Sequence, residues 1–441
     1  MIDHTIKFIF VLTFVFILVM NSCTKDEPET PIVTTCDNSK TPIVMLHGFL
    51  ASGDTYSNFF QLFKANGYCN DALYVMDRNT LDFNKDFTPI LDVFIDKVLL
   101  NTGAEKVNLM GHSAGGGVAY AYLEDETKAQ KVASYAHLGS FNQTKPAGST
   151  GNIPTINVFS DADKIVPGQD IPEATNINLI VADHYQVATS TEAFQFIYRF
   201  FNNSELPKNL QPITEQESIE LEGTVLTLGE NTPVEGANIA VFELAANTGI
   251  RLNDEPTTTT KSDENGKWTN VTVQPNVAYE FFVANPSDEN FTPLHYYFEP
   301  FSSNNSLIYL RAIPPAGSVA GGFLATVPKD DEQAVAAIFT ATQAVINGRD
   351  ELFINDIELS TAALSSAEQS TIAVFLYDDF DGQTTGKPHP GLLANTPFLN
   401  SADVFMQPNS DQFSTINFND DKLAVPHWPS KTDGFSIVVF D

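Results

Sequence analysis

Short apolar runs alternate with longer, helix-like segments over residues 41–203. The runs have the length of buried strands, and they lie at residues 43–46, 73–76, 107–110, 156–159 and 177–180. Helix-length segments, such as residues 90–100 and 118–126, separate them. Strands that alternate with helices predict an α/β fold with a mostly parallel, doubly wound sheet, whose functional residues gather at the carboxyl ends of the strands.

The pattern changes after a polar, proline-containing segment at residues 204–212, which we interpret as a linker. Beyond it, short apolar or alternating runs are separated by Gly, Pro, Asn and Asp. This spacing is typical of all-β domains. We therefore expect a β-sandwich over residues 213–312 and a second β-sandwich or half-barrel over residues 313–441.

The N-terminus has the pattern of a targeting signal. Residues 8–20 are apolar except for Thr13. This run is too short to cross the bilayer core, which needs about 20 residues, and its length suits a signal peptide over residues 1–22. The run ends just before Cys23, and the junction resembles a bacterial lipoprotein signal, in which this cysteine is lipidated. Residues 25–27, a lysine followed by two acids, resemble a surface-export tag.

We therefore expect an exported, outer-membrane lipoprotein, anchored through Cys23, with a flexible tether over residues 23–40; the tag favours display on the outer face. Two cysteines remain, Cys36 and Cys69. In an exported protein they favour a disulfide, and the alternative is two free buried thiols. The net charge of −32 argues against a nucleic-acid partner, because a polyanion does not readily approach a phosphate backbone.

The sharpest motif is the sequence Gly-His-Ser-Ala-Gly at residues 111–115. It follows an apolar strand and precedes a predicted helix, which is the setting of a nucleophile elbow. In such a turn the hydroxyl of Ser113 projects above the sheet, and the helix start offers N–H groups to a developing oxyanion. The alternative is a glycine-rich turn in a scaffold that does no chemistry.

A nucleophilic serine needs a base and an orienting acid, in the chain order Ser, acid, His for this fold. His184 follows the last predicted strand and is the candidate base. Asp163 is the preferred acid and Asp161 the alternative, since both follow the strand at residues 156–159. We interpret Asp183, next to the base, as a solvated loop carboxylate.

The oxyanion would be bound by two backbone N–H groups, those of Ala114 and Phe49. Leu50, Tyr56 and Phe141 are candidates to line an acyl groove, although such side chains are more often plain core. The segment between the strands at residues 73–76 and 107–110 has no insertion long enough for a large lid, so we expect an open site. We expect no cofactor and no metal site.

Residues 41–200 resemble the secreted bacterial lipases and esterases called lipase class 2. The matching stretches are residues 42–48, 101–107, 111–116 and 160–166. The resemblance implies an α/β-hydrolase fold with Ser113, Asp163 and His184 as the catalytic triad and Phe49 and Ala114 as oxyanion donors. The usual methionine after the nucleophile is replaced here by Ala114.

The C-terminal half resembles known modules more weakly. Residues 223–225, 233–237 and 262–268 resemble the transthyretin-like, carboxypeptidase-regulatory-type sandwich. An α/β hydrolase followed by such a region resembles lipases that carry a C-terminal β-barrel lipid-binding region. This resemblance implies that the β domains help to engage lipid; the alternative is a spacer that holds the enzyme away from the membrane.

Together these features predict a serine carboxylic-ester hydrolase, a lipase or esterase that acts on triacylglycerol or on short and medium acyl esters through an acyl-enzyme. The substrate partner would be a lipid or another ester, including an insoluble one. Two alternatives stay open: a polyester depolymerase with the same triad, and a surface-binding lipoprotein without catalytic activity.

Overall fold

The computed structural model describes residues 36–215 and 217–441. The predicted signal peptide, Cys23 and most of the predicted tether lie outside the described residues. Within the described ranges, no helix is both long and apolar enough to cross a bilayer. Cys36 and Cys69 form a disulfide with a Cα–Cα distance of 4.9 Å, which joins the start of the described chain to the α/β domain.

The α/β domain is built on one six-stranded sheet in the order β2-β1-β3-β4-β5-β6, with every neighbouring pair parallel. The strands are β1 (Ile43–Leu46), β2 (Leu73–Met76), β3 (Val107–His112), β4 (Val132–Leu138), β5 (Thr155–Phe159) and β6 (Thr175–Asn178). The predicted doubly wound sheet is confirmed. The last strand begins and ends two residues earlier than its apolar run suggested.

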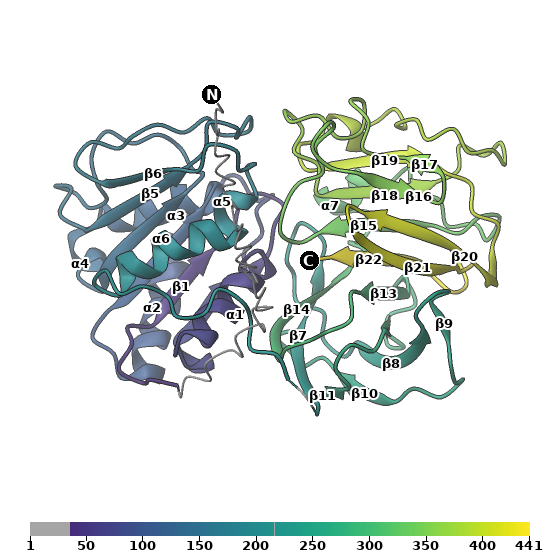
Figure 1. Cartoon of the computed structure of the whole chain (residues 1–441), viewed down its shortest axis with the longest axis horizontal. Coiled ribbons are helices and arrows are strands. Elements are labelled where there is room, and N and C mark those ends of the chain that lie inside the picture. Colours follow the sequence, from purple (N-terminus) through teal and green to yellow (C-terminus); the bar gives the residue numbers. More distant parts are fainter. Residues whose placement is uncertain (1–35, 216) are drawn as a thin grey trace, which may run out of the picture. The chain divides into compact units, whose positions relative to one another are not determined.

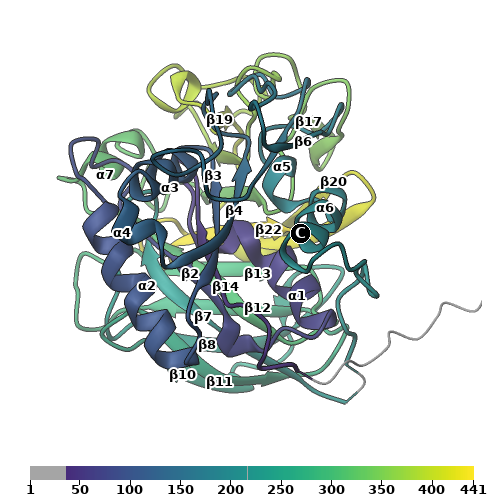
Figure 2. The ribbon, with the colours of Figure 1, turned by 90° about the vertical axis from the view of Figure 1, so that its left-hand side faces the viewer.

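Helices cover both faces of this sheet (Figure 2). One face carries α1 (Ser57–Ala65), α5 (Gln186–Thr189) and α6 (Thr191–Phe201), and the other carries α2 (Thr88–Thr102), α3 (Ala114–Leu123) and α4 (Glu126–Ala129). Phenylalanines of α1 and α6 pack on the first face, whereas Leu91 and Ile95 of α2 pack on the second. Burying each such side chain stabilises the fold by about 1.5–3 kcal/mol.

The strand order reverses direction at β1. The chain passes from β1 to β2 on one side, and then returns to place β3 on the other side. Loops at the carboxyl ends of strands diverge at such a switch point and leave a crevice there. The segments that follow β1 and β3 therefore face each other across the position where a ligand binds in sheets of this type.

Residues 217–441, here called the β region, hold three further sheets (Figure 1). The strands of its first part are β7 (Ile219–Thr227), β8 (Asn238–Ala245), β9 (Ile250–Arg251), β10 (Thr258–Lys261), β11 (Lys267–Val273), β12 (Tyr279–Ala284), β13 (Leu294–Phe298) and β14 (Asn305–Ala312). Those of its second part are β15 (Ala336–Thr340), β16 (Leu352–Ile354), β17 (Ile357–Glu358), β18 (Ala373–Tyr377), β19 (Leu399–Asp403), β20 (Asn409–Phe418), β21 (Asp421–His427) and β22 (Phe435–Phe440). The predicted all-β character is confirmed.

The largest of these sheets combines strands from both predicted β domains. Its order is β10-β8-β12-β13-β22-β15-β18-β19, and β13 pairs in parallel with β22 through neighbours such as Tyr296 and Ile437. The smaller sheets are β11-β7-β14 and β17-β16-β20-β21. One hydrophobic core also contains residues from both parts, for example Trp268 and Phe375. Periodicity along the chain predicts strands but not their partners, so this union was not visible in the sequence.

Polar side chains of the β region bind loops at the carboxyl edge of the parallel sheet. Arg311 forms an ion pair with Asp54 at 2.6 Å, within the short 3-10 helix η1 (Gly53–Tyr56). The Tyr309 hydroxyl donates a 2.7 Å hydrogen bond to Asp77, the residue that follows β2. Asn231 donates a 2.8 Å bond to the carbonyl of Ala51, beyond β1. The β region therefore contacts the same edge at which the predicted site lies.

Candidate active site

Ser113 occupies a strained turn between β3 and α3. Its backbone has φ 51° and ψ −123°, a conformation that costs a non-glycine residue about 1–3 kcal/mol and persists only when its surroundings hold it. Its N–H donates to the carbonyl of Leu138 at 2.9 Å, and its own carbonyl accepts from the Ser140 hydroxyl at 2.6 Å. These bonds fix the turn that the motif at residues 111–115 predicted.

Close backbone approach explains two of the glycines around Ser113. A Cβ atom on Gly115 would overlap the carbonyl oxygen of Leu46 and lie 2.7 Å from that of His47. A Cβ atom on Gly48 would lie 3.1 Å from the Cβ of Ser113. The start of α3 therefore packs directly on the end of β1, and only glycine fits between them.

The predicted base and the preferred acid are in direct contact. Nδ1 of His184 lies 2.7 Å from Oδ2 of Asp163, and both side chains are buried. The other carboxylate oxygen, Oδ1, accepts hydrogen bonds from the backbone N–H groups of Ile165 and Val166 at 2.8 and 2.9 Å. Asp161, the alternative acid, is exposed. This pairing directs Nε2 of the imidazole away from the carboxylate, as a general base requires.

Nε2 of His184 is buried and has no hydrogen-bond partner among the described residues. Ser113 and His184 border the same small cavity, but their side chains form no hydrogen bond within the described part of the chain. In free serine hydrolases this bond is often long and shortens when substrate binds. The Nε2 atom therefore has no partner within the described residues that would compete for a hydroxyl proton.

Phe49 and Ala114, the predicted oxyanion donors, lie on the two sides of Ser113. Ala114 is the first residue of α3, and N–H groups in the first turn of a helix have no partner within that helix. Gly48 and Phe49 border the small cavity. His47 stabilises this loop, since its Nδ1–H donates to the Gly48 carbonyl at 3.0 Å.

His47 is held neutral in this arrangement. Burial and, to a lesser extent, nearby Arg78 lower its pKa to about 3. Its Nε2 accepts the backbone N–H of Arg78 at 3.2 Å, and the guanidinium of Arg78 donates to the His47 carbonyl at 2.9 Å. The loop after β1 is therefore tied to the segment after β2.

His112 positions the base from the other side. Its Nε2–H donates to the backbone carbonyl of His184 at 2.9 Å, and the two ring centroids are 4.7 Å apart. Burial holds the pKa of His112 well below its usual range, so the ring is neutral. The sequence placed His112 only in the glycine-flanked turn, and its contact with His184 depends on the packing of distant loops.

The interpretation of Asp183 as a solvated carboxylate is wrong. Its side chain is only 2% exposed and forms a 2.9 Å ion pair with Arg349 of the β region. It also accepts the backbone N–H of Ala344 at 3.1 Å. Burial raises the pKa of Asp183, and Arg349 opposes that shift. Nothing near Asp183 in the sequence indicates this partner, because Arg349 lies far along the chain.

The predicted acyl groove is not formed by the residues proposed for it. Tyr56 is fully buried in the core and donates its hydroxyl to the Leu46 carbonyl at 2.8 Å. Phe141 is 59% exposed and lies outside the cavity beside Ser113. Leu50 is buried against the core of the β region. Aromatic and aliphatic side chains next to a motif pack wherever the tertiary structure offers apolar surface, so proximity in sequence was a poor guide.

The cavity beside Ser113, here called the catalytic pocket, is small. Its free volume is about 10 Å³, and it is bordered by Gly48, Phe49, Ala51, His112, Ser113, His184, Tyr185, Ile372 and Phe398. Two of these residues, Ile372 and Phe398, come from the β region. The α/β domain has no lid insertion, but these two residues narrow the space beside the candidate nucleophile.

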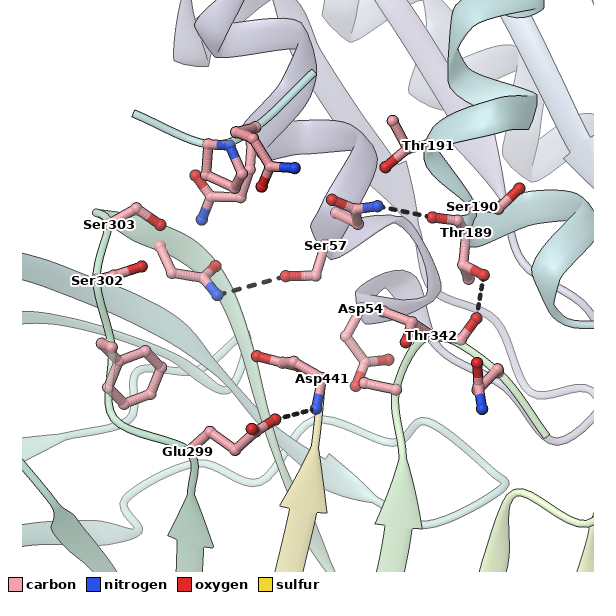
Figure 3. A pocket seen from close by; sticks show the side chains of 18 of the residues that line it. Asp54, Ser57, Thr189, Ser190, Thr191, Glu299, Ser302, Ser303, Thr342 and Asp441 are labelled. Carbon is pink, nitrogen blue, oxygen red and sulfur yellow. Dashed lines mark hydrogen bonds between the residues drawn. The ribbon is translucent and has the colours of Figure 1, made fainter. Parts of the chain in front are cut away.

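A larger cavity of about 570 Å³ lies apart from the catalytic pocket (Figure 3). Its lining is rich in hydroxyl, amide and carboxylate groups and includes Asp54, Ser57 and Glu299. Burial raises the pKa of Glu299 to about 7. Neither Ser113 nor His184 reaches this cavity. Among the described residues no cluster of three His, Cys, Asp or Glu side chains could hold a metal ion.

Two family models match the chain. Residues 41–169 match the model described as the alpha/beta hydrolase fold, and residues 217–315 match the model described as the lipase C-terminal domain. The first match covers Ser113 and Asp163, and the second covers the first part of the β region. These matches confirm the predicted fold and the resemblance to an α/β-hydrolase lipase with a C-terminal β region.

Solved structures that resemble the chain include hydrolases from fungi and bacteria. Lipase B of Aspergillus fumigatus is 14% identical, with a TM-score of 0.32 over 39% of this chain and 54% of that one, so the match spans about half of that lipase. An esterase from Rhodococcus is 15% identical, with a TM-score of 0.32 over 39% and 94% of the two chains. The mature lipase of Bacillus licheniformis is 16% identical, with a TM-score of 0.30 over 38% and 95%.

Proposed function

We propose that this protein hydrolyses carboxylic esters, with Ser113 as nucleophile, His184 as base and Asp163 as orienting acid. The observation that supports this most strongly is the 2.7 Å contact between His184 Nδ1 and Asp163 Oδ2 in the same buried pocket as the strained Ser113. A nucleophile, a base and an orienting group in this order form a serine hydrolase triad.

The reaction has two steps. Ser113 Oγ attacks the ester carbonyl carbon while Nε2 of His184 accepts the hydroxyl proton. The same imidazolium then gives that proton to the departing alcohol, and an acyl-enzyme remains on Ser113. A water molecule, deprotonated by His184, attacks this acyl group and releases the carboxylic acid, which restores the free serine. Asp163 stabilises the imidazolium in both steps.

The N–H groups of Ala114 and Phe49 would bind the oxyanion that forms on the carbonyl oxygen. Removing one such donor costs about 2.7–4 kcal/mol of transition-state stabilisation in comparable sites. His47 supports this role indirectly, because it fixes the carbonyl of Gly48 and thereby the orientation of the next peptide unit.

The test is hydrolysis of nitrophenyl esters with acyl chains from C2 to C16 by the protein that lacks residues 1–23. We expect activity in the wild type and its loss in Ser113→Ala. Asp163→Asn should reduce kcat by several orders of magnitude, since the wrong tautomer of His184 is then favoured. The matched control is Asp161→Asn, an exposed neighbour, which should retain wild-type rates. The chain-length profile would separate an esterase from a lipase.

An inactive wild type with every ester would contradict the proposal and favour the non-catalytic binding protein. Activity that survives in Ser113→Ala would assign the nucleophile elsewhere. Equal losses in Asp161→Asn and Asp163→Asn would contradict the assignment of the acid.

We also propose that the protein is exported and anchored through a lipid on Cys23. The disulfide between Cys36 and Cys69 supports export, because such bonds persist in oxidising compartments. Incorporation of labelled palmitate by a bacterial host, with Cys23→Ala as the unlabelled control, tests the anchor. Protease treatment of intact cells then tests display on the outer face.

A further inference from the structure

A phenylalanine of the β region lies directly on the candidate base. The rings of Phe398 and His184 are nearly parallel, with centroids 5.6 Å apart and an interplanar angle of 18°. Phe398 is only 6% exposed, and together with Ile372 it closes the catalytic pocket on the side of the β region. The α/β domain supplies the nucleophile, base and acid, but the β region supplies this wall.

The backbone of Phe398 is strained and held in place. Its φ is 75°, which is rare for a bulky side chain and costs about 1–3 kcal/mol. Its N–H donates to the carbonyl of Gln369 at 2.9 Å, and its carbonyl accepts the N–H groups of Ile372 and Ala373 at 2.8 and 3.0 Å. These three hydrogen bonds join the segment that contains Phe398 to residues 369–373, and they fix the direction of the Phe398 Cβ.

The free volume of the catalytic pocket, about 10 Å³, limits the size of the molecules that can enter it. It is close to the space that one water molecule needs, whereas pockets that hold organic ligands measure about 300–1,000 Å³. An ester therefore reaches Ser113 only when a wall side chain moves. The backbone of Phe398 is braced, so rotation of its ring is the smallest movement that opens the pocket.

We propose that Phe398, supported by Ile372, is the specificity-determining gate of the catalytic pocket and sets the upper size limit of the esters that react. This inference rests on the proposed ester hydrolysis. Small esters need a small displacement of the Phe398 ring, whereas bulky acyl or alcohol groups need its complete removal from the face of His184. The β region thereby selects substrates at the reacting centre itself.

The experiment compares kcat/KM of the wild type, Phe398→Ala, Phe398→Gly and Ile372→Ala. One ester series varies the acyl group with a fixed nitrophenyl alcohol, and a second series varies the alcohol of fixed acetate esters. The matched control is Phe380→Ala. Phe380 is another phenylalanine of the β region with positive φ (62°), but it is 67% exposed and lies outside the pocket.

We expect Phe398→Ala and Phe398→Gly to raise kcat/KM for the bulkiest esters of at least one series by 10-fold or more relative to the acetate ester. Ile372→Ala should give a smaller shift in the same direction, and Phe380→Ala none. Glycine accepts the positive φ without strain, so Phe398→Gly should remain folded where Phe398→Ala is destabilised. Thermal unfolding of each variant checks this point.

Covalent labelling gives a second readout. The rate at which a nitrophenyl phosphonate with a bulky alkyl group phosphonylates Ser113, with release of nitrophenolate, should rise at least 10-fold in Phe398→Gly, while the rate for the corresponding nitrophenyl methylphosphonate should change less than twofold. Suppose that the wild type hydrolyses acetate esters and Ser113→Ala does not. Folded Phe398 variants that keep the wild-type dependence of kcat/KM on ester size, and the wild-type labelling rates, would then overturn the proposed gate. A wild type that neither hydrolyses esters nor reacts with phosphonates would instead overturn the proposed function.

Discussion

Arg349 of the β region forms a 2.9 Å ion pair with Asp183, the residue that precedes His184 in the chain. Asp183 in turn accepts the backbone N–H groups of Tyr185 and Gln186 at 2.8 and 2.9 Å. The loop that carries the candidate base is therefore fixed by a carboxylate whose charge is balanced from a distant part of the sequence. Arg349 is thus a positioning residue for His184, although it does not reach the catalytic pocket.

The first prediction concerns this pair. Arg349→Ala leaves two buried carboxylates, Asp183 and Asp350, without their shared cation. We expect a 10- to 100-fold fall in kcat with little change in KM, because the loop of His184 loses its orientation. Breaking a hydrogen bond to a charged group costs about 1–3 kcal/mol. Steady-state kinetics with an acetate ester measure the effect, and Arg349→Lys, which keeps the charge, should restore part of the rate.

A double-mutant cycle separates this role from a general loss of stability. Asp183→Asn removes the buried charge. The double variant with Asp183→Asn and Arg349→Ala should therefore lose less transition-state stabilisation than the sum of the losses in the two single variants. If Arg349→Ala lowers the unfolding temperature but the folded fraction keeps the wild-type kcat, Arg349 contributes to stability alone.

The second prediction concerns the packing of α3 against β1. In Gly115→Ala the new methyl group overlaps the Leu46 carbonyl, so the start of the helix must shift. We expect a loss of about 1–3 kcal/mol in the free energy of unfolding and at least a 100-fold loss of activity, because Ser113 and the Ala114 N–H move with the helix. Urea titration and ester hydrolysis measure the two effects.

The control for this change is Gly117→Ala in the same helix. A methyl group there would meet only the ring of Phe141, at 3.8 Å, which is ordinary contact. Alanine also has a higher helix propensity than glycine, so this variant should be as active and as stable as the wild type or slightly more stable. Equal damage in both variants would show that the helix tolerates no added methyl group and that contact with β1 is not the cause.

The third prediction concerns pH and Asp77. Burial raises its pKa from the usual 3.8 to about 6, although Tyr309 and the Gly53 N–H donate hydrogen bonds that lower it. The folded protein therefore binds this proton more tightly than the unfolded chain does. The contribution of this proton to the free energy of unfolding is complete below about pH 4 and is lost as the pH rises through about 6.

We expect the fall in the free energy of unfolding between pH 4 and pH 6 to be about 1–3 kcal/mol smaller in Asp77→Asn than in the wild type. Other buried carboxyl groups with raised pKa, such as Glu299, contribute the remaining pH dependence. The free energy of unfolding in urea, measured from pH 4 to pH 8, tests the prediction. Asp82→Asn, at an exposed position, is the control and should keep the wild-type profile. A pH dependence in Asp77→Asn equal to that of the wild type would contradict the role of Asp77.

The fourth prediction concerns the disulfide between Cys36 and Cys69, which are 33 positions apart in the chain. Closing a loop of this size stabilises a protein by about 2–4 kcal/mol, chiefly by restricting the unfolded chain. The double variant Cys36→Ala/Cys69→Ala should therefore unfold at a lower temperature. Addition of dithiothreitol should lower the unfolding temperature of the wild type and leave that of the double variant unchanged.

The order of residues alone was enough to predict the α/β sheet and the turn that carries Ser113. Both depend on neighbouring residues: the apolar runs, the glycines at residues 111 and 115, and the strand–turn–helix order. It also selected His184 and Asp163, because chain order and position after a strand restrict the choice. The geometry of Asp163 then distinguished it from Asp161, since its Oδ2 contacts His184 while its Oδ1 accepts two local N–H groups.

The surroundings of this site, in contrast, follow from tertiary contacts. Phe398, Ile372 and Arg349 lie far from His184 in the sequence, and no local pattern links them to it. They reach the loops beyond β1, β3 and β6 because the β region packs on the carboxyl edge of the parallel sheet. Local spacing predicts the candidate catalytic residues, whereas the shape of the pocket depends on contacts between distant segments, which form only when the whole chain folds.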